Sequence, residues 1–409
     1  MLALVLTGLV AAASAAPVLR PGDRVAIVGN TFADQLRVHG YFETFLLQLA
    51  PEPRLSVRNL GWGGDMLSAR DRPTNFPAEE KALVAHRTDV IIACFGMGES
   101  FAGEEGLPAF RAALKAFVDS HRDRKYNGRT EVRLILVSPI AYENLGASTP
   151  EHERRNRELA DYSAAMEQVA AAQELPFVDL FRPTRELMAD ANAPKLTTNG
   201  IHLNAYGHWA VGRMLAESML AGPRTWALRV DARTGRAAGE GVTITQVEPG
   251  AAGVRFTVAE QRPPSLAPPT KGPVHAALQP LRDTLAVTNL APGDYLLTID
   301  GEAVLTAGHA SWAAGVAIDA SPCHREAEAL RQAVNDKNLQ WIYSWKALNQ
   351  VHIVGERKSS PSGRALPAEL VEFGRIAERK DEALRTAAPP LVRSREWRLT
   401  PVPPPHFRP

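Results

Sequence analysis

The feature that most constrains the fold is a regular alternation of short apolar runs with longer amphipathic stretches, which begins at Arg24 and continues to about residue 220. The apolar runs have the length of strands, and the amphipathic stretches have the length of helices. This alternation is typical of parallel strands joined by crossover helices, so we predict an α/β domain with a parallel five-stranded sheet over residues 20–222. The predicted strands are 24–29, 55–60, 89–95, 132–138 and 176–180, and the predicted helices are 33–49, 78–86, 107–120, 151–173 and one after Asn204.

The sequence changes character after Pro223, where apolar and polar residues alternate over short segments. The alternating segments are 241–247, 253–258 and 295–301. Alternation of this kind predicts half-buried antiparallel strands, and we expect a small β-sandwich over residues 224–306. The proline-rich stretch 262–270 cannot form a central strand, so we expect it to be a surface loop.

The last part of the chain is expected to be a helical region over residues 307–390, followed by a proline-rich extended tail over 391–409. The helical region carries Trp341 and Trp345 one helical turn apart. Such a pair can stack on a sugar, but it more often fills a core against a neighbouring domain, which is the interpretation we favour.

The N-terminus, residues 1–16, is an apolar segment that ends in small residues, as signal peptides do. The segment is too short for a stable membrane anchor. Because it lacks a basic beginning, a buried N-terminal helix remains the alternative. We expect a signal peptide and therefore export to the periplasm or the extracellular space.

The charge balance argues against several classes of partner. The chain has 46 Lys and Arg against 45 Asp and Glu, a net charge of +1, which disfavours nucleic acid and charged membrane surfaces. No transmembrane span is visible in the sequence. We expect a small molecule or a neutral polymer such as a carbohydrate ester as the partner, and the oligomeric state stays open.

The sequence contains no arrangement of residues that is typical of a metal or cofactor site. Two cysteines, Cys94 and Cys323, allow one disulfide at most, so neither a disulfide framework nor a cysteine metal site is expected. The histidines lack metal-ligand spacing, and the glycines at 61–64 lack the ending of a phosphate-binding loop. The sequence therefore predicts no metal and no cofactor.

The loops after the predicted strands carry short elements rich in Gly, Asn and acidic residues. Because the carboxyl ends of parallel strands meet at one edge of a sheet, we expect these side chains to converge there. The loop elements are 28–31, 59–65, 95–100 and 199–204, and the polar side chains expected to converge are Asn30, Asp65, Glu99, Glu143, Asn144 and His202. Local alternatives exist, because Asn30 and Asn199 suit tight turns and Asp65 can cap a helix.

In order, spacing and placement, these four elements resemble the blocks of the SGNH (GDSL-like) hydrolases, a superfamily of esterases, lipases and acetylesterases. The resemblance covers about half of the chain and implies a three-layer α/β/α domain. In that family a Gly-Asp-Ser block provides a nucleophilic serine, and an Asp-x-x-His block provides the base and the acid that orients it. A glycine N–H and an asparagine side chain then help to bind the oxyanion.

The resemblance assigns roles to two residues that match the family. Gly64 corresponds to the oxyanion glycine, and His202, in Ile-His-Leu-Asn before the last predicted helix, corresponds to the base. The other positions depart from the family pattern. Thr31 stands in place of the serine, Asn30 of the aspartate before it, Gly98 of the oxyanion asparagine, Asn199 of the orienting aspartate and Glu99 of a second acid.

These departures predict that the family's standard mechanism is weak or absent. Loss of one oxyanion donor lowers a rate by about 10²- to 10³-fold. An amide in place of the orienting acid lowers it by about 10⁴-fold in the serine-protease template. A threonine hydroxyl can attack a carbonyl, but its branched side chain is stiff.

Three hypotheses about function follow from the residues present. The leading one is an exported ester hydrolase with an altered catalytic set, acting on acylated carbohydrate. In it, His202 is the base, Gly64 an oxyanion donor, and Thr31 or water the nucleophile. The second is a catalytically silent module, a pseudoenzyme, that binds a glycan or an acylated ligand. The third is an interaction subunit of an exported assembly.

Overall fold

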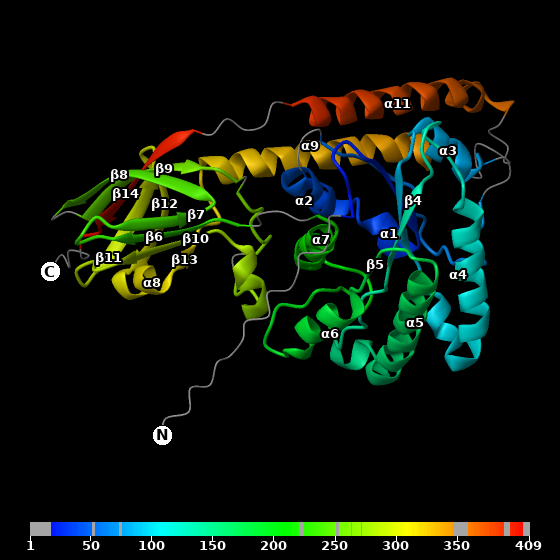
Figure 1. Cartoon of the computed structure of the whole chain (residues 1–409), viewed down its shortest axis with the longest axis horizontal. Coiled ribbons are helices and arrows are strands. Elements are labelled where there is room, and N and C mark those ends of the chain that lie inside the picture. The colour runs from blue at the N-terminus through cyan, green and yellow to red at the C-terminus, as the bar shows by residue number, and fades with distance from the viewer. Residues whose placement is uncertain are drawn as a thin grey trace.

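The computed structural model describes residues 18–50, 54–72, 76–220, 225–250, 253–262, 264–270, 272–346, 359–387 and 393–403. The predicted signal peptide lies outside them. An α/β domain forms one end of the molecule and a β-sandwich the other, and helix α9 (Pro322–Trp345) runs between the two (Figure 1).

The α/β domain is built on a parallel five-stranded sheet with the strand order β2-β1-β3-β4-β5. The strands are β1 (Arg24–Gly29), β2 (Ser56–Asn59), β3 (Val90–Cys94), β4 (Arg133–Val137) and β5 (Phe177–Val178). All five predicted strands are therefore confirmed. They were readable because a strand covered on both faces is a continuous apolar run.

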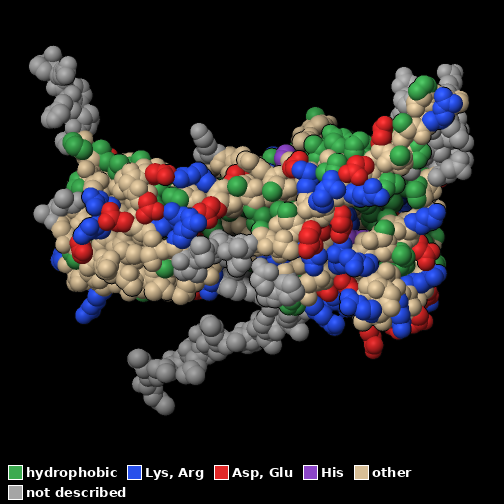
Figure 2. Space-filling model, turned by 90° about the horizontal axis from the view of Figure 1, so that it is seen from above, with side chains coloured by type: hydrophobic (Ala, Val, Ile, Leu, Met, Phe, Trp, Pro, Cys, Tyr) green, Lys and Arg blue, Asp and Glu red, His purple; other side chains and the backbone are tan. Residues whose placement is uncertain are grey.

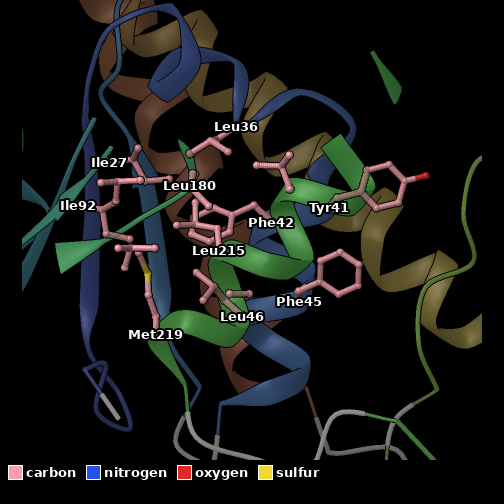
Figure 3. Packing of buried hydrophobic residues seen from close by; sticks show 14 of the residues in the cluster. Ile27, Leu36, Tyr41, Phe42, Phe45, Leu46, Ile92, Leu180, Leu215 and Met219 are labelled. Carbon is pink, nitrogen blue, oxygen red and sulfur yellow. The ribbon is translucent and has the colours of Figure 1, made fainter. Parts of the chain in front are cut away.

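Helices cover both faces of this sheet, which makes the domain a three-layer α/β/α structure. Ile27 and Ile92 face the layer that contains α2 and α7, where Phe42, Leu46 and Leu215 pack against them (Figure 3). Alternate residues of the same strands face the layer that contains α3, α4 and α5. The helices are α1 (Thr31–Gln35), α2 (Tyr41–Leu49), α3 (Glu79–Ala85), α4 (Leu107–His121), α5 (His152–Ala172), α6 (Phe181–Ala189) and α7 (Ala205–Met219).

Two helix predictions need correction. The helix expected over 33–49 is split into α1 and α2 by the 3₁₀ turn η1 (Val38–Gly40), because His39 and Gly40 adopt positive φ angles of 63° and 69°. Helix α6, which contains Pro183, was not predicted. The proline lies in the first turn of α6, where a missing N–H removes no helical hydrogen bond.

The second end of the molecule is a sandwich of two sheets around a separate core that includes Trp226, Phe256 and Trp397. One sheet has the strand order β13-β10-β6-β7, and the other has the order β12-β11-β14-β9-β8. The strands are β6 (Ala227–Asp231), β7 (Ala237–Glu240), β8 (Val242–Gly250), β9 (Gly253–Glu260), β10 (Thr284–Thr288), β11 (Asp294–Ile299), β12 (Glu302–Gly308), β13 (Val316–Ala317) and β14 (Ser394–Pro401). The sandwich is therefore larger than the predicted range 224–306.

Strand β14 corrects the prediction of an extended tail over 391–409. It pairs antiparallel with β9 on one side and β11 on the other, and its Trp397 and Leu399 are fully buried. The alternation of apolar and polar residues before Val402 is a strand pattern that the nearby prolines obscured. Residues 391, 392 and 404–409 lie outside the described residues.

The proline-rich stretch 262–270 also differs from the prediction. It forms no strand, as expected, but it is not a surface loop, because Leu266 is 2% exposed and packs in the core of the α/β domain. The indole Nε1 of Trp209 donates a hydrogen bond to the Leu266 carbonyl at 2.8 Å. Prolines suit such a buried segment because they have no N–H that would need a partner.

The helical region predicted over 307–390 contains α8 (His309–Ala314), the long helix α9 and helix α11 (Pro361–Thr386). Helices α9 and α11 pack on each other and beside strand β2 of the α/β domain (Figure 1). Together they cover the β2 edge of the parallel sheet. Shorter 3₁₀ helices are η2 (Glu99–Ala102), η3 (Glu104–Gly106), η4 (Gly146–Ser148) and η5 (Ala276–Leu281).

A buried ion cluster joins these helices to the sheet. The ammonium of Lys337, with no exposed side-chain surface, lies 2.5 Å from Glu43 Oε1 of α2 and donates to the Val57 carbonyl of β2 at 2.8 Å. Asp381 of α11 accepts a hydrogen bond from the Ser56 hydroxyl and lies 3.8 Å from the same ammonium. Burial raises the pKa of Glu43, and Lys337 opposes that shift.

The surface of the molecule is mixed in charge. Figure 2 shows basic and acidic side chains interspersed over the face that it presents. Within the described ranges, none of the helices combines the length and the apolar character that a bilayer crossing requires.

We expect Lys337→Met to destabilise the protein by about 3–5 kcal/mol, because it leaves the buried carboxylate of Glu43 without its cation. The matched control is Lys380→Met, which removes the half-exposed ion pair between Lys380 and Asp336 on the same two helices. The control should change the free energy of unfolding by less than about 1 kcal/mol. Urea denaturation measures both values, and equal losses in the two variants would contradict the prediction.

Candidate active site

The loop after β1 places the hydroxyl of Thr31 at the carboxyl end of the parallel sheet. Thr31 is the first residue of α1, and the side chain of Asn30 caps this helix by accepting hydrogen bonds from the backbone N–H groups of Phe32 and Ala33. The Asn30 N–H donates to the Cys94 carbonyl of β3 at 3.1 Å. Asn30 is therefore a structural residue that positions the threonine.

The loop after β2 brings Gly64 to this hydroxyl. The Gly64 N–H donates a hydrogen bond to Thr31 Oγ1 at 3.1 Å. The next residue, Asp65, is 3% exposed, and its two carboxylate oxygens each lie 2.7 Å from a guanidinium nitrogen of Arg72. The structure thus unites Thr31 and Gly64, whereas Asp65 anchors the loop instead of facing a ligand.

The loop after β3 is fastened to the glycine loop by Glu99. Its carboxylate accepts hydrogen bonds from the N–H of Leu67 at 2.9 Å and from the N–H of Gly96 at 2.8 Å. Burial raises the pKa of Glu99, and these backbone donors oppose the shift. Glu99 therefore acts as a clamp between two loops.

Gly98 stands where the resemblance places an oxyanion asparagine. A Cβ atom at this position would lie 2.9 Å from Cγ of Met66. The thioether side chain of Met66 therefore packs directly against Gly98, on the side from which a side chain would emerge. Position 98 has no side chain to donate a hydrogen bond, and a larger residue there requires Met66 to move.

His202 and Asn199 form the second pair of the site. Nδ2 of Asn199 lies 3.0 Å from Nδ1 of His202, and Oδ1 of Asn199 accepts the backbone N–H of His202 at 3.0 Å. Because Oδ1 is occupied by this N–H, the amide nitrogen faces the ring, and an amide nitrogen can only donate. Nδ1 of His202 is therefore an acceptor, which places the ring proton on Nε2.

The loop that carries this pair is held from below by Glu143, which is 1% exposed. Its carboxylate accepts hydrogen bonds from the N–H groups of Leu196 and Thr197 and from the Thr197 hydroxyl. Its own N–H donates to the Gly200 carbonyl at 2.9 Å. The sequence placed Glu143 among the converging polar residues, and the structure shows that it fixes the shape of the histidine loop.

Asn144 does not join the site. Its side chain is exposed, accepts a hydrogen bond from the Gly146 N–H at 2.9 Å and lies 3.2 Å from Nε2 of His152. These contacts shape a local turn. Among the described residues, no hydrogen bond joins Thr31 to His202, so the two pairs remain separate in this structure.

A Ser-His-Asp arrangement lies apart from this site, at the junction of the sandwich with α9, where the sequence offered no signal. The Ser321 hydroxyl is 2.7 Å from Nδ1 of His324, and Nε2 of His324 is 3.4 Å from Asp283. All three side chains are buried, and Ser321 also caps α9. Asp283 accepts the backbone N–H groups of Trp226 and Ser265. This arrangement is a structural junction without access for a substrate.

Other parts of the molecule offer less chemistry. A cavity of about 530 Å³ lies at the opposite, amino-terminal edge of the parallel sheet, where it is lined by Val18, His121 and Arg133 among others. Burial lowers the pKa of His121 to about 4, so the ring is neutral at pH 7. Within the described part of the chain, no three His, Cys, Asp or Glu side chains form a group that could hold a metal ion.

Comparisons with known proteins agree with this geometry. Residues 27–210 match the model of the GDSL-like lipase/acylhydrolase family. The solved structure of a gut microbial diltiazem-metabolizing enzyme is 18% identical, covers 95% of this chain and 99% of its own, and has a TM-score of 0.68. That likeness shows that the fold, including the C-terminal half, is shared.

A second solved structure is the acetylxylan esterase Axe2 from Geobacillus stearothermophilus. It is 17% identical, covers 49% of this chain and 96% of its own, and has a TM-score of 0.37. No curated protein matches the chain.

We expect Glu143→Gln to destabilise the protein by about 1.5–3 kcal/mol, because an amide group turns one N–H toward the backbone donors that the carboxylate satisfies. Hydrogen exchange in residues 195–204 should accelerate together with the loss of stability. The exposed Glu105→Gln is the control, since it also replaces an acid with an amide. Unchanged exchange in this loop would show that Glu143 does not hold it.

Proposed function

Because residues 27–210 belong to the GDSL-like lipase/acylhydrolase family, we propose that this chain is an ester hydrolase with an altered catalytic set. The observation that carries the proposal is the hydrogen bond from the Gly64 N–H to Thr31 Oγ1. It places a hydroxyl nucleophile beside a backbone donor of the kind that stabilises an oxyanion. The same N–H can bind the carbonyl oxygen once a substrate displaces the hydroxyl from it.

In the proposed reaction, Thr31 Oγ1 attacks the ester carbonyl, and its proton passes to His202. The alcohol leaves with that proton, and water then hydrolyses the acyl-threonine through the same base. His202 carries its proton on Nε2 in this structure, so Nε2 becomes a base only after the proton moves to Nδ1. That shift requires Asn199 to turn its oxygen toward the ring and to release the His202 N–H. The expected rate is therefore low.

The substrate class that we propose is a small acyl ester, with acylated carbohydrate as the physiological form. Two features support this choice: the N-terminal segment has the pattern of an export signal, and a β-sandwich follows the α/β domain. Both features are common in enzymes that act on extracellular polymers, although a fold alone does not determine a substrate. N-terminal sequencing of the mature protein tests the export step, and an uncleaved Met1 in the native host would reject it.

A silent binding module is the second candidate, and two observations favour it. The Asn199 amide leaves the proton of His202 on Nε2, so that this nitrogen is a hydrogen-bond donor and not a base. Met66 packs against Gly98, where the family has its oxyanion asparagine. A site of this kind can retain an acylated ligand without turning it over. It predicts saturable binding of acetylated oligosaccharide in the absence of hydrolysis.

The decisive assay measures hydrolysis of p-nitrophenyl acetate and acetylated xylan by the wild type, Thr31→Ala and His202→Ala. We expect each substitution to lower kcat by about 10²-fold or more, because each removes a group that acts in the transition state. Loss in His202→Ala alone would indicate water as the nucleophile. If the wild type does not exceed a buffer blank on a broad ester panel, the enzyme hypothesis is rejected in favour of the binding module.

We also expect Asn199→Asp to raise kcat by at least about tenfold, since the carboxylate accepts the Nδ1 proton and frees Nε2 to act as a base. Asn192→Asp is the matched control, because it adds the same charge at an exposed position of a nearby loop. A pH–rate profile of both variants distinguishes an increase in kcat at every pH from an increase in kcat that follows the protonation state of the histidine. An Asn199→Asp variant no faster than the control would show that the tautomer of His202 does not limit the rate.

A further inference from the structure

The end of helix α9 lies against the loop that carries Gly64. The indole Nε1 of Trp341 donates a hydrogen bond to the Asn59 carbonyl, at the start of this loop, at 2.8 Å. The ring of Trp345 meets the ring of Trp62 edge-on, with 6.5 Å between centroids. Trp341 and Trp345 therefore pack against the α/β domain, as we expected, and the surface that they contact is part of the candidate site.

Lys346, which follows α9 directly, connects the two halves of the Thr31–Gly64 pair. Its ammonium is 2.7 Å from Oδ1 of Asp34 and 4.9 Å from the ring centroid of Trp62. Asp34 belongs to α1, three residues after Thr31, and Trp62 is two residues before Gly64. One cation thus contacts both the helix that carries the hydroxyl and the loop that carries the N–H.

Lys346 makes these contacts in a partly buried environment. Its side chain is 19% exposed and that of Asp34 is 14% exposed, so the ion pair is largely shielded from water. Burial lowers the pKa of Lys346, and Asp34 opposes the shift. The guanidinium of Arg72 also lies over the Trp62 ring, with its Cζ atom 4.5 Å from the ring centroid. Arg72 pairs with Asp65 in the same loop. Trp62 is therefore held by one cation from its own loop and one from the C-terminal half.

We propose that Lys346 is a positioning residue for the Thr31–Gly64 pair, so that the C-terminal half completes the active site of the α/β domain. This inference rests on the proposed function and adds to it a residue that lies outside the family domain. A displacement of about 1 Å at a reacting group can lower a rate by about 10²-fold. Loss of the Lys346 contacts removes the only described ion pair between α1 and the C-terminal half, and the glycine loop then shifts relative to the hydroxyl.

The kinetic test compares Lys346→Met with Lys346→Arg and with the control Lys380→Met. We expect Lys346→Met to lower kcat by about 10- to 100-fold with little change in KM, because it disturbs the reacting groups and not substrate binding. Lys346→Arg should restore most of the rate, since a guanidinium also pairs with a carboxylate and stacks on an aromatic ring. Lys380→Met should retain the wild-type rate. A wild-type kcat in Lys346→Met, or no recovery in Lys346→Arg, overturns the proposal.

A second measurement does not depend on turnover. Hydrogen–deuterium exchange of the full chain should become about tenfold faster in residues 30–35 and 61–66 of Lys346→Met, and it should stay unchanged in β3 and in the sandwich. If the wild type hydrolyses no ester but the exchange responds in this way, the proposed function fails and the positioning role stands. If the exchange of both segments equals that of the wild type, the positioning role is rejected whatever the activity.

Discussion

The contact on which the rest of the structure depends is the buried ammonium of Lys337 between Glu43 and the edge strand β2. A charge without exposed surface persists only when partners surround it, and here the partners come from α2, β2 and α11. Helices α9 and α11 are therefore part of the α/β domain, although 102 residues or more of chain separate them from its last helix. They also cover a sheet edge that would otherwise present unpaired backbone groups.

This arrangement explains why the site is assembled from both halves of the chain. The cluster around Lys337 fixes the axis of α9, and the same helix then carries Trp341, Trp345 and Lys346 to the glycine loop. The loop is consequently supported by α9 and by Lys346. The β-sandwich is linked to this system because α9 begins at its junction, where Ser321 and His324 are buried.

Three carboxylates that looked like pocket acids serve the loops instead. Asp65 binds Arg72, Glu99 joins two loops through backbone N–H groups, and Glu143 supports the histidine loop. Buried carboxylates need such donors, because a charge left without partners in the interior is unfavourable. The chemical groups that remain are a hydroxyl, a backbone N–H and an imidazole, and the proposed ester hydrolysis rests on these three.

Sequence patterns located all five strands of the parallel sheet, because burial on both faces produces a continuous apolar run that needs no knowledge of the partner strands. They failed where a distant contact decided the outcome. The break at Gly40, which packs closely against Arg331 of α9, the burial of Leu266 and the pairing of β14 between β9 and β11 all involve segments far away in the sequence. The prolines around the end of β14 indicated an extended tail, but the strand forms there because it pairs with β9 and β11.

For the site, the sequence by itself determined which chemical groups are present: threonine in place of serine, glycine in place of the oxyanion asparagine, and Asn199 beside the histidine. Only the tertiary structure decided their states. The Asn199 amide directs the proton of His202 to Nε2, Met66 packs against Gly98, and Lys346 reaches Asp34 across the domain. The physical reason is that a tautomer, a filled space and an ion pair depend on which atoms lie in contact. Local sequence periodicity does not specify those contacts.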